Sequence, residues 1–213
     1  MELDSLEIDI PAPAGRQESA KRQQILDGAR KVFMAQGFDG ASMGEIARTA
    51  GVSKGTLYVY FDSKEQLFEA IAHEACAAQA EGVFSLDEAD HDVEAVLTRL
   101  GRGFVRFICR PGAMSPLRTV ISISERMPEI GKEFYESGPA KGREMVRRYL
   151  EAQVAVGILA IEDCDIAAAQ FLESCSATIF KPLLFNAGKA PTQERINHVV
   201  GIAVHTFLAA YQR

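Results

Sequence analysis

The apolar residues of this chain recur every three or four positions along nearly all of its 213 residues. That spacing puts them on one face of an α-helix, whereas a half-buried β-strand requires strict alternation of apolar and polar residues. We see neither an alternating stretch nor an internal repeat, and glycine, proline and short polar segments interrupt the pattern. The sequence therefore predicts an all-α fold of about nine helices.

Residues 1–15 stand apart from this pattern. They contain two prolines, four acidic residues and no basic residue, and they show no helical periodicity. We therefore expect a disordered tail. The first helix is predicted over about residues 17–36. Gly37 supplies the left-handed conformation that commonly ends a helix, which would let Phe38 fold back onto Phe33.

Two short helices joined by a tight turn are predicted within residues 42–61. Ser42 and Glu45 form a capping-box pattern, in which each side chain bonds to the backbone of the other residue. Gly51 offers the positive φ that a tight turn needs, and Ser53 can cap the helix that follows. This arrangement is a helix-turn-helix, whose second helix enters the major groove of DNA.

The second of these helices exposes residues that suit contact with DNA. Gly55 allows the backbone to approach closely, while Thr56 and Tyr58 can contact base edges. Tyr60 and Lys64 are placed for the flanking phosphates. The candidate DNA-binding residues are Ser42, Ser53, Lys54, Gly55, Thr56, Tyr58, Tyr60 and Lys64.

The segment from Ala20 to Phe68 closely resembles the N-terminal domain of TetR/AcrR-type transcriptional regulators, through the stretch IARTAGVSKGTLYVYFDSKEQLF. The resemblance implies a helix-turn-helix DNA-binding domain over residues 16–68 and a helical ligand-binding and dimerisation domain over residues 69–213. Residues 118–150, RTVISISERMPEIGKEFYESGPAKGREMVRRYL, are similar to the AefR-like subgroup. The implied function is that of a ligand-responsive regulator, a homodimeric repressor released from a palindromic, inverted-repeat operator by a small hydrophobic molecule.

Two alternative functions can be weighed against this one, and the net charge bears on the first. The chain has a formal charge of −6, which argues against an architectural protein that binds DNA through bulk positive charge. Residues 16–68 nevertheless carry eight basic against six acidic residues. A second alternative, a helical small-molecule-binding protein without specific operator binding, is disfavoured by the intact motif over residues 53–60.

The remainder of the chain predicts helices over about residues 63–83, 93–109, 116–124, 128–156, 164–186 and 192–211, with an interruption or kink at Gly138-Pro139. In the resembled family the ligand cavity lies among the middle helices. We expect it to be lined by Phe104, Phe107, Ile108, Leu117, Ile121, Phe134, Tyr149 and Phe171. The family dimerises through its last two helices, and here the expected interface residues are Phe171, Ala177, Val200, Val204, Phe207 and Leu208.

Other chemistry has little support in the sequence. No nucleophile–base motif, phosphate-binding loop or dinucleotide fingerprint is present, so we expect neither an enzyme nor a cofactor. His73 and Cys76 share a helix face, but no second pair completes a metal site. The chain has no secretory signal and no apolar run long enough to span a membrane, which predicts a cytoplasmic protein without a membrane partner.

Overall fold

The computed structural model describes residues 14–83 and 85–212, without the side chains of residues 14–17 and 75–82. The predicted tail, residues 1–15, falls outside this part except for its last two residues, which already belong to the first helix. The described residues form helices and no strand, apart from an isolated bridge between Leu159 and Gln212. The predicted all-α class is thus confirmed, and the described residues form ten helices of seven residues or more, close to the predicted number of about nine.

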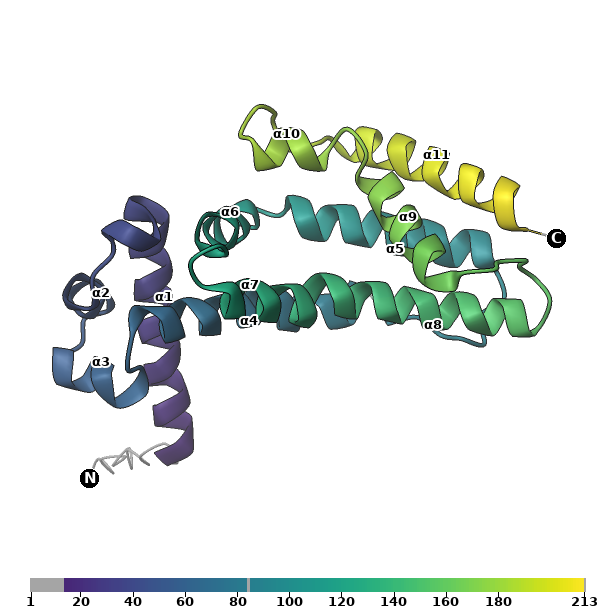
Figure 1. Cartoon of the computed structure of the whole chain (residues 1–213). Coiled ribbons are helices and arrows are strands. Elements are labelled where there is room, and N and C mark those ends of the chain that lie inside the picture. The colour runs from purple at the N-terminus through teal and green to yellow at the C-terminus, as the bar shows by residue number, and fades with distance from the viewer. Residues whose placement is uncertain (1–13, 84, 213) are drawn as a thin grey trace, which may run out of the picture. The chain divides into compact units, whose positions relative to one another are not determined.

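The chain divides into two compact units between Ala70 and Ile71. Unit 1 contains α1 (Ala14–Gly40), α2 (Met43–Ala50) and α3 (Lys54–Tyr60), which Figure 1 shows as the purple and blue part of the ribbon. The boundary falls within α4 (Lys64–Val83), so this helix is covalently shared by both units.

A cluster of phenylalanines closes the core of unit 1. Gly37 has φ 72° and ψ 178°, which breaks the helical path near the end of α1. The ring of Phe38 thereby stacks on Phe33 at 5.7 Å, as the sequence predicts. Phe68 of α4 meets both rings edge-on, at 5.5 Å and 5.6 Å between centroids.

The helices α1 and α2 approach unusually closely at Gly28. A Cβ atom added to Gly28 would lie 2.6 Å from the Cβ of Ala50 and 2.7 Å from its Cα. On the preceding turn of α1, Gln24 donates from Nε2 to the carbonyl of Ala50 at 2.6 Å. This bond satisfies a carbonyl at the end of α2 that has no partner within its own helix. Gly28 and Gln24 together fix α2, and with it the turn that follows.

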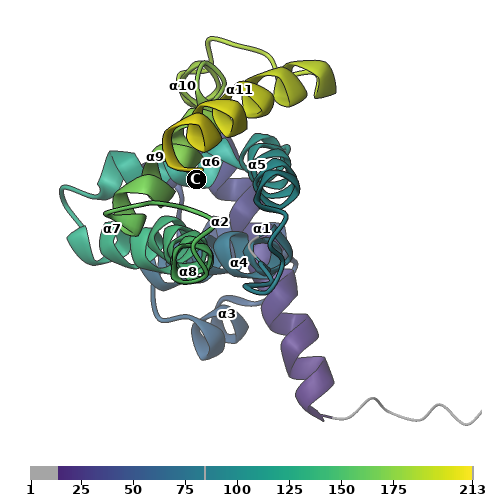
Figure 2. The same cartoon turned by 90° about the vertical axis from the view of Figure 1, so that its right-hand side faces the viewer.

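Unit 2 is built around α5 (Val93–Cys109), α8 (Lys141–Ala155), α9 (Cys164–Ser176) and α11 (Gln193–Tyr211). In both Figure 1 and Figure 2, α9 lies between α8 and α11, and it packs on α5 as well. Gly101 of α5 permits this close packing, because an added Cβ would lie 2.8 Å from Val200 and 2.9 Å from the sulfur of Cys175.

Shorter helices complete unit 2: α6 (Met114–Ile123), α7 (Pro128–Tyr135) and α10 (Phe180–Leu184). Gly138-Pro139 lies in a π-helical turn, η1 (Glu136–Ala140), which joins α7 to α8 without a break. The single helix predicted over residues 164–186 is wrong, because this stretch contains two helices, α9 and α10. The chain leaves helical geometry between α9 and α10, where Thr178 adopts a φ of 64°.

Two buried polar side chains tie the segment before α5 to α8. The hydroxyl of Tyr149 donates to the carbonyl of Asp90 at 2.9 Å. Gln153 donates from Nε2 to the carbonyl of Glu88 at 2.9 Å, and its Oε1 lies 2.9 Å from Nδ1 of His91. Since burying an unsatisfied polar group is unfavourable, these bonds specify how the segment lies on α8.

None of the described helices is long and apolar enough to cross a membrane.

Candidate functional sites

The turn between α2 and α3 has the geometry that the sequence predicts. Gly51 lies in the left-handed region, with φ 67° and ψ 36°. Its N–H donates to the carbonyl of Arg48 at 3.2 Å, and the N–H of Val52 donates to that of Ala47 at 3.0 Å. These bonds use the orphan carbonyls at the end of α2, so the chain can turn sharply into α3.

Both short helices are capped by serine. The hydroxyl of Ser42 accepts a bond from the N–H of Glu45 at 3.2 Å, and that of Ser53 accepts one from Thr56 at 3.0 Å. The hydroxyls of Ser53 and Thr56 also lie 2.8 Å apart. The expected return bond from Glu45 to Ser42 is replaced, because the Glu45 carboxylate accepts a bond from Arg48 at 3.0 Å.

One face of α3 is open to solvent. Leu57 is buried and anchors the helix, whereas Tyr58 is 49% exposed and Val59 is 81% exposed. Of the other candidate residues on this helix, Lys54 and Gly55 are exposed and Thr56 and Tyr60 are half-buried. Val59 is not among the predicted DNA-binding residues, which are small, hydroxylic or basic, although an apolar residue at an exposed helical position can contact thymine methyl groups.

Lys54 lies against the first turn of α2. A Cβ atom added to Gly44 would be 2.9 Å from Cε of Lys54 and 3.2 Å from its Nζ. The ammonium group therefore lies close to the N-terminal end of α2, where backbone N–H groups already favour negative charge. Lysine and helix N-terminus together suit a DNA phosphate.

Lys64 has a different environment from the one expected. Its Nζ donates to the carbonyls of Phe38 at 2.9 Å and Ala41 at 3.4 Å, and it lies 4.6 Å from the centroid of the Phe38 ring. These contacts occupy the ammonium group within unit 1. The structure thus gives Lys64 a stabilising role at the end of α1 in place of the expected phosphate contact.

Unit 2 contains a cavity of about 330 Å³ among α5, α6, α7, η1, α8, α9 and α10. Five of the eight expected lining residues do border it, namely Phe104, Phe107, Ile108, Leu117 and Phe134. Most of the remaining wall is also apolar, and it includes Met114, Pro116, Leu172 and Phe180.

The other three expected lining residues, Ile121, Tyr149 and Phe171, are corrected. The side chain of Ile121 is on the outer face of α6 and is 53% exposed. Tyr149 is fully buried beside Asp90, and burial raises the pKa of its hydroxyl to about 12. Phe171 packs edge-on against Phe207 at 5.4 Å in the core. Helical spacing indicates burial, but it does not separate a cavity wall from a filled core.

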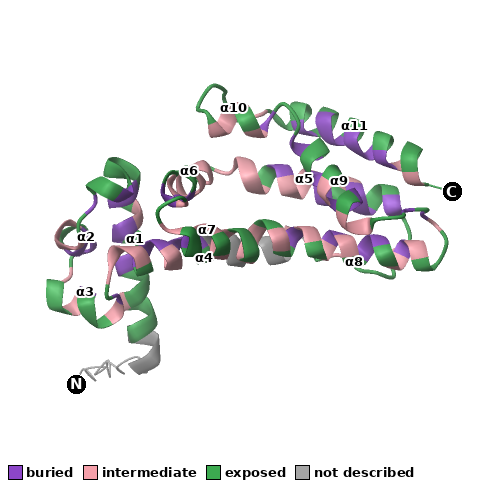
Figure 3. Cartoon of the chain, viewed as in Figure 1, coloured by how far each residue is buried: buried purple, intermediate pink, exposed green. Residues whose placement is uncertain are grey.

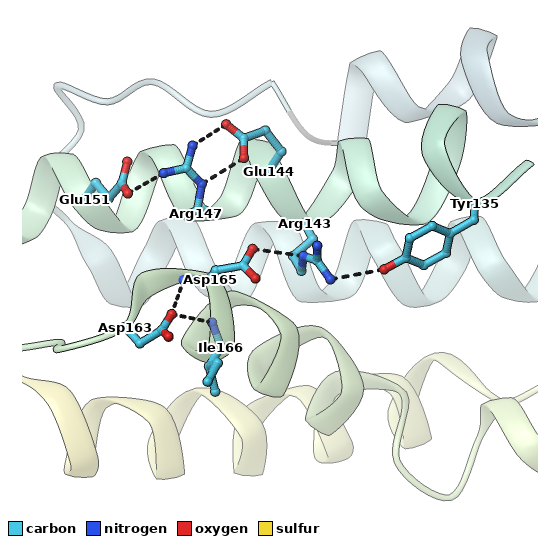
Figure 4. Close-up of polar contacts among 8 residues, drawn as sticks. All are labelled: Tyr135, Arg143, Glu144, Arg147, Glu151, Asp163, Asp165 and Ile166. Carbon is cyan, nitrogen blue, oxygen red and sulfur yellow. Dashed lines mark hydrogen bonds and ion pairs between the residues drawn. The ribbon is translucent and has the colours of Figure 1, made fainter. Parts of the chain in front are cut away.

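The charged residues on the cavity wall are not among the expected lining residues. Arg143 lies between two partners in Figure 4: its Nη1 donates to the hydroxyl of Tyr135 at 3.2 Å, and its Nε is 3.0 Å from Oδ1 of Asp165. The hydrogen bond with Tyr135 and the charge of Asp165 raise the pKa of Arg143. Arg143 and Tyr135 line the cavity, together with Arg110 and Glu173.

The expected interface residues need a correction too. Phe171, Val200, Val204 and Phe207 are buried in the core of their own chain, where α11 packs on α5 and α9. Their side chains are therefore not on a surface that a second copy could cover. Ala177 is exposed and Leu208 is half-buried. In Figure 3, α11 presents one buried and one exposed face.

Metal and thiol chemistry find no new support in the structure. Within the part of the chain whose side chains are described, His, Cys, Asp and Glu form no cluster of three that could hold a metal ion. His73 is exposed, and Cys76 lies among the side chains outside that part. Burial raises the pKa of the thiols of Cys109, to about 11, and Cys175, to about 12, so these remain protonated and poorly nucleophilic.

Comparison with family models gives two matches. Residues 25–71 match the model described as "Bacterial regulatory proteins, tetR family". Residues 95–213, more than half of the chain, match the model described as "AefR-like transcriptional repressor, C-terminal domain".

The curated relatives match about a third of the chain's length. The HTH-type transcriptional repressor AcnR of Corynebacterium diphtheriae is 39% identical over 74 residues, which are 35% of this chain and 39% of the relative. AcnR of Corynebacterium glutamicum is 40% identical over 70 residues, 33% of this chain and 37% of the relative. The match thus spans well under half of each relative.

Solved structures match almost the whole chain. A TetR-family transcriptional regulator from Mesorhizobium loti has a TM-score of 0.84 at 24% identity, over 92% of this chain and 99% of the other. The flavonoid-responsive regulator FrrA has a TM-score of 0.75 at 29% identity, over 91% of this chain and 98% of its own. The similarity to the Mesorhizobium loti protein, at 24% identity, shows the fold alone.

Proposed function

The chain belongs to the TetR family of bacterial regulatory proteins, with an AefR-like C-terminal domain, and on that premise we propose that it is a repressor released from its operator by a small molecule. It is a DNA-binding regulator. We further propose that unit 1 binds an inverted-repeat operator, that unit 2 binds an effector, and that two copies act together in the cytoplasm.

The helix-turn-helix of unit 1 carries the proposal. The helix α3 is anchored by buried Leu57, follows a left-handed turn at Gly51 and leaves Tyr58 largely exposed. A short helix held in this way can enter the major groove, with Thr56, Tyr58 and Val59 next to base edges. Lys54 and the serine caps would contact phosphates.

The cavity of unit 2 supports binding of a small molecule. Its volume of about 330 Å³ and its aromatic wall suit an aromatic ligand. A structural neighbour is named as flavonoid-responsive, which favours an aromatic effector here also. Because α4 is shared by both units, a shift of this helix would reposition α3 relative to the α3 of a second copy. Half-sites are about one helical turn apart, so a displacement of a few Å would prevent simultaneous binding.

The competing function is a helical small-molecule-binding protein that does not recognise an operator. Footprinting on DNA upstream of the chain's own gene, at a stated salt concentration, tests this. We expect protection of an inverted repeat. Protection of an asymmetric or single half-site would contradict the proposed operator, and equal affinity for random DNA would favour the competing function.

Base contacts are tested by substitution. Thr56→Ala or Tyr58→Ala should lower affinity for the operator by about 1–3 kcal/mol and relax base preference at one position. Thr49→Ala is a matched control, since Thr49 is an exposed threonine on α2 beside α1. Equal losses on operator and random DNA would show that Thr56 and Tyr58 do not read bases.

A further inference from the structure

The cavity of unit 2 has a polar, partly solvent-exposed end formed by Tyr135, which is 49% exposed, and Arg143, which is half-buried. The phenolic oxygen of Tyr135 already accepts a bond from Nη1 of Arg143, so its own O–H remains available as a donor. Among the described residues, Nη2 of Arg143 forms no hydrogen bond that would occupy it. Two donors, one of them positively charged, are thus present at one end of a largely apolar cavity.

The other polar side chains on the cavity wall, those of Arg110, Ser176 and Glu173, are less suited to bind an anion. Arg110 donates to the carbonyl of Phe107 at 2.6 Å, and its guanidinium lies 4.1 Å from the centroid of the Phe107 ring. The hydroxyl of Ser176 donates to the carbonyl of Glu173 at 3.1 Å. The Glu173 side chain is exposed, and its carboxylate would repel an anion at its own position on α9. The position of Arg143 is therefore the one best suited to a negative charge.

Resting on the effector-binding function proposed above, we propose that the effector is an aromatic acid, held through an anionic oxygen by Tyr135 and Arg143. Its ring would lie among Phe104, Phe107 and Phe134, which line the same cavity. A charge enters an apolar cavity only where hydrogen bonds and an opposite charge replace its lost hydration. The Tyr135 hydroxyl and the Arg143 guanidinium supply both, and charge-assisted bonds of this kind are the stronger ones.

Asp165 makes the proposal testable because it competes for the same guanidinium. Its Oδ1 lies 3.0 Å from Nε of Arg143, although this N–H is buried and poorly aligned for a hydrogen bond. Asp165 is not among the residues that line the cavity. Figure 4 shows it at the start of α9, where Asp163 caps the helix. Removing the Asp165 charge would therefore strengthen the attraction between Arg143 and an anionic ligand.

The first experiment measures binding of benzoate, cinnamate and 2-naphthoate to the full chain by calorimetry, without DNA. Each acid is compared with its methyl ester, which keeps the ring and loses the charge. We expect at least one acid to bind about 10-fold or more tightly than its ester, as for a hydrogen bond to a charged group. The proposal is overturned if no acid binds more tightly than its ester.

The second experiment repeats the titrations with three variants. Arg143→Gln should weaken the acid about 10-fold and leave the ester nearly unchanged. Tyr135→Phe should weaken the acid in the same direction by less, since it removes one hydroxyl and no charge. Asp165→Asn should strengthen the acid. If Arg143 only braces α8 against α9, Arg143→Gln and Asp165→Asn will act alike on acid and ester, and this result refutes the proposal.

Operator release is measured separately, so the two proposals can fail independently. An acid that binds with these variant effects but does not release DNA would refute the proposed effector function and leave the ligand assignment standing. Release of DNA by neutral aromatic compounds only, with no binding of acids, would support the regulator and refute the ligand assignment.

Discussion

Gly28→Ala should destabilise unit 1 because no space exists for one methyl group. The added Cβ would lie 2.6 Å from the Cβ of Ala50, 2.7 Å from its Cα and 2.8 Å from its nitrogen. Two of these atoms are backbone, so α1 and α2 must move apart. Overpacking of this kind costs about 1–3 kcal/mol. Loss of the bond from Gln24 to the Ala50 carbonyl would add about 1 kcal/mol.

The gain in helix propensity opposes these losses. Replacing a helical glycine by alanine stabilises by about 0.5–1 kcal/mol, which leaves a net destabilisation of about 2 kcal/mol for Gly28→Ala. Gly44→Ala is the matched control, because the atoms nearest its added Cβ are the end of the flexible Lys54 side chain. We expect Gly44→Ala to be neutral or slightly stabilising.

Differential scanning calorimetry of the full chain tests this, with hydrogen exchange of α1 and α2 to assign the transition to unit 1. A loss of 2 kcal/mol in a domain of this size corresponds to roughly 8–16 °C. Ala50→Gly should rescue Gly28→Ala only in part, because the Cα and nitrogen of residue 50 remain in contact range. If Gly28→Ala and Gly44→Ala unfold at the same temperature, the reasoning from close approach is refuted.

Single contacts of Lys64, Tyr149 and Gly101 can each be tested by one substitution. Lys64→Ala should destabilise unit 1 by about 1–2 kcal/mol in urea unfolding, whereas Lys54→Ala should leave stability unchanged and weaken binding of every DNA sequence. Equal effects of both on stability would contradict this. Tyr149 has a pKa raised from 10 to about 12, so its contribution to stability should be complete below pH 10 and lost between pH 10 and 12. Between pH 10 and 12 the unfolding free energy of Tyr149→Phe should depend less steeply on pH than that of the unchanged protein. Identical curves of unfolding free energy against pH for the two proteins would contradict this prediction. Gly101→Ala should destabilise unit 2 by about 1–3 kcal/mol in thermal unfolding, and an unchanged or higher Tm would contradict it.

Helix boundaries were predictable wherever the signal is local. Gly51, Ser53 and Pro128 each act through bonds or steric limits within a few residues, and the structure has a turn, a cap and a helix start at these positions. The break at Thr178 was missed because its cause is not local. A threonine with positive φ is strained, and here its hydroxyl accepts a bond from Arg195, 17 residues away, at 2.7 Å.

The cavity was predictable only in part. Phe104 and Phe107 line it, while Tyr149 and Phe171, which are equally aromatic and equally periodic, fill the core. Apolar periodicity reports that a side chain avoids water, and both locations meet that condition. Arg143 was missed for the opposite reason. A charged residue on a helix normally indicates the solvated face, and the position of Arg143 on the cavity wall depends on its contacts with Tyr135 and Asp165, which lie on other helices.

The same ambiguity explains the interface assignment. The apolar stripe of α11 shows that one face is buried, but not by which chain, and α5 and α9 of the same chain already cover Val200 and Phe207. A second copy could meet only the opposite face, which includes Gly201 and Ile202. Ile202 is 56% exposed, and a Cβ added to Gly201 would meet nothing within 4 Å. An exposed glycine in mid-helix is unfavourable in an isolated chain, and it becomes useful where another backbone must approach closely. If the family's mode of dimerisation holds here, this face of α11 is therefore the one that the structure leaves for it.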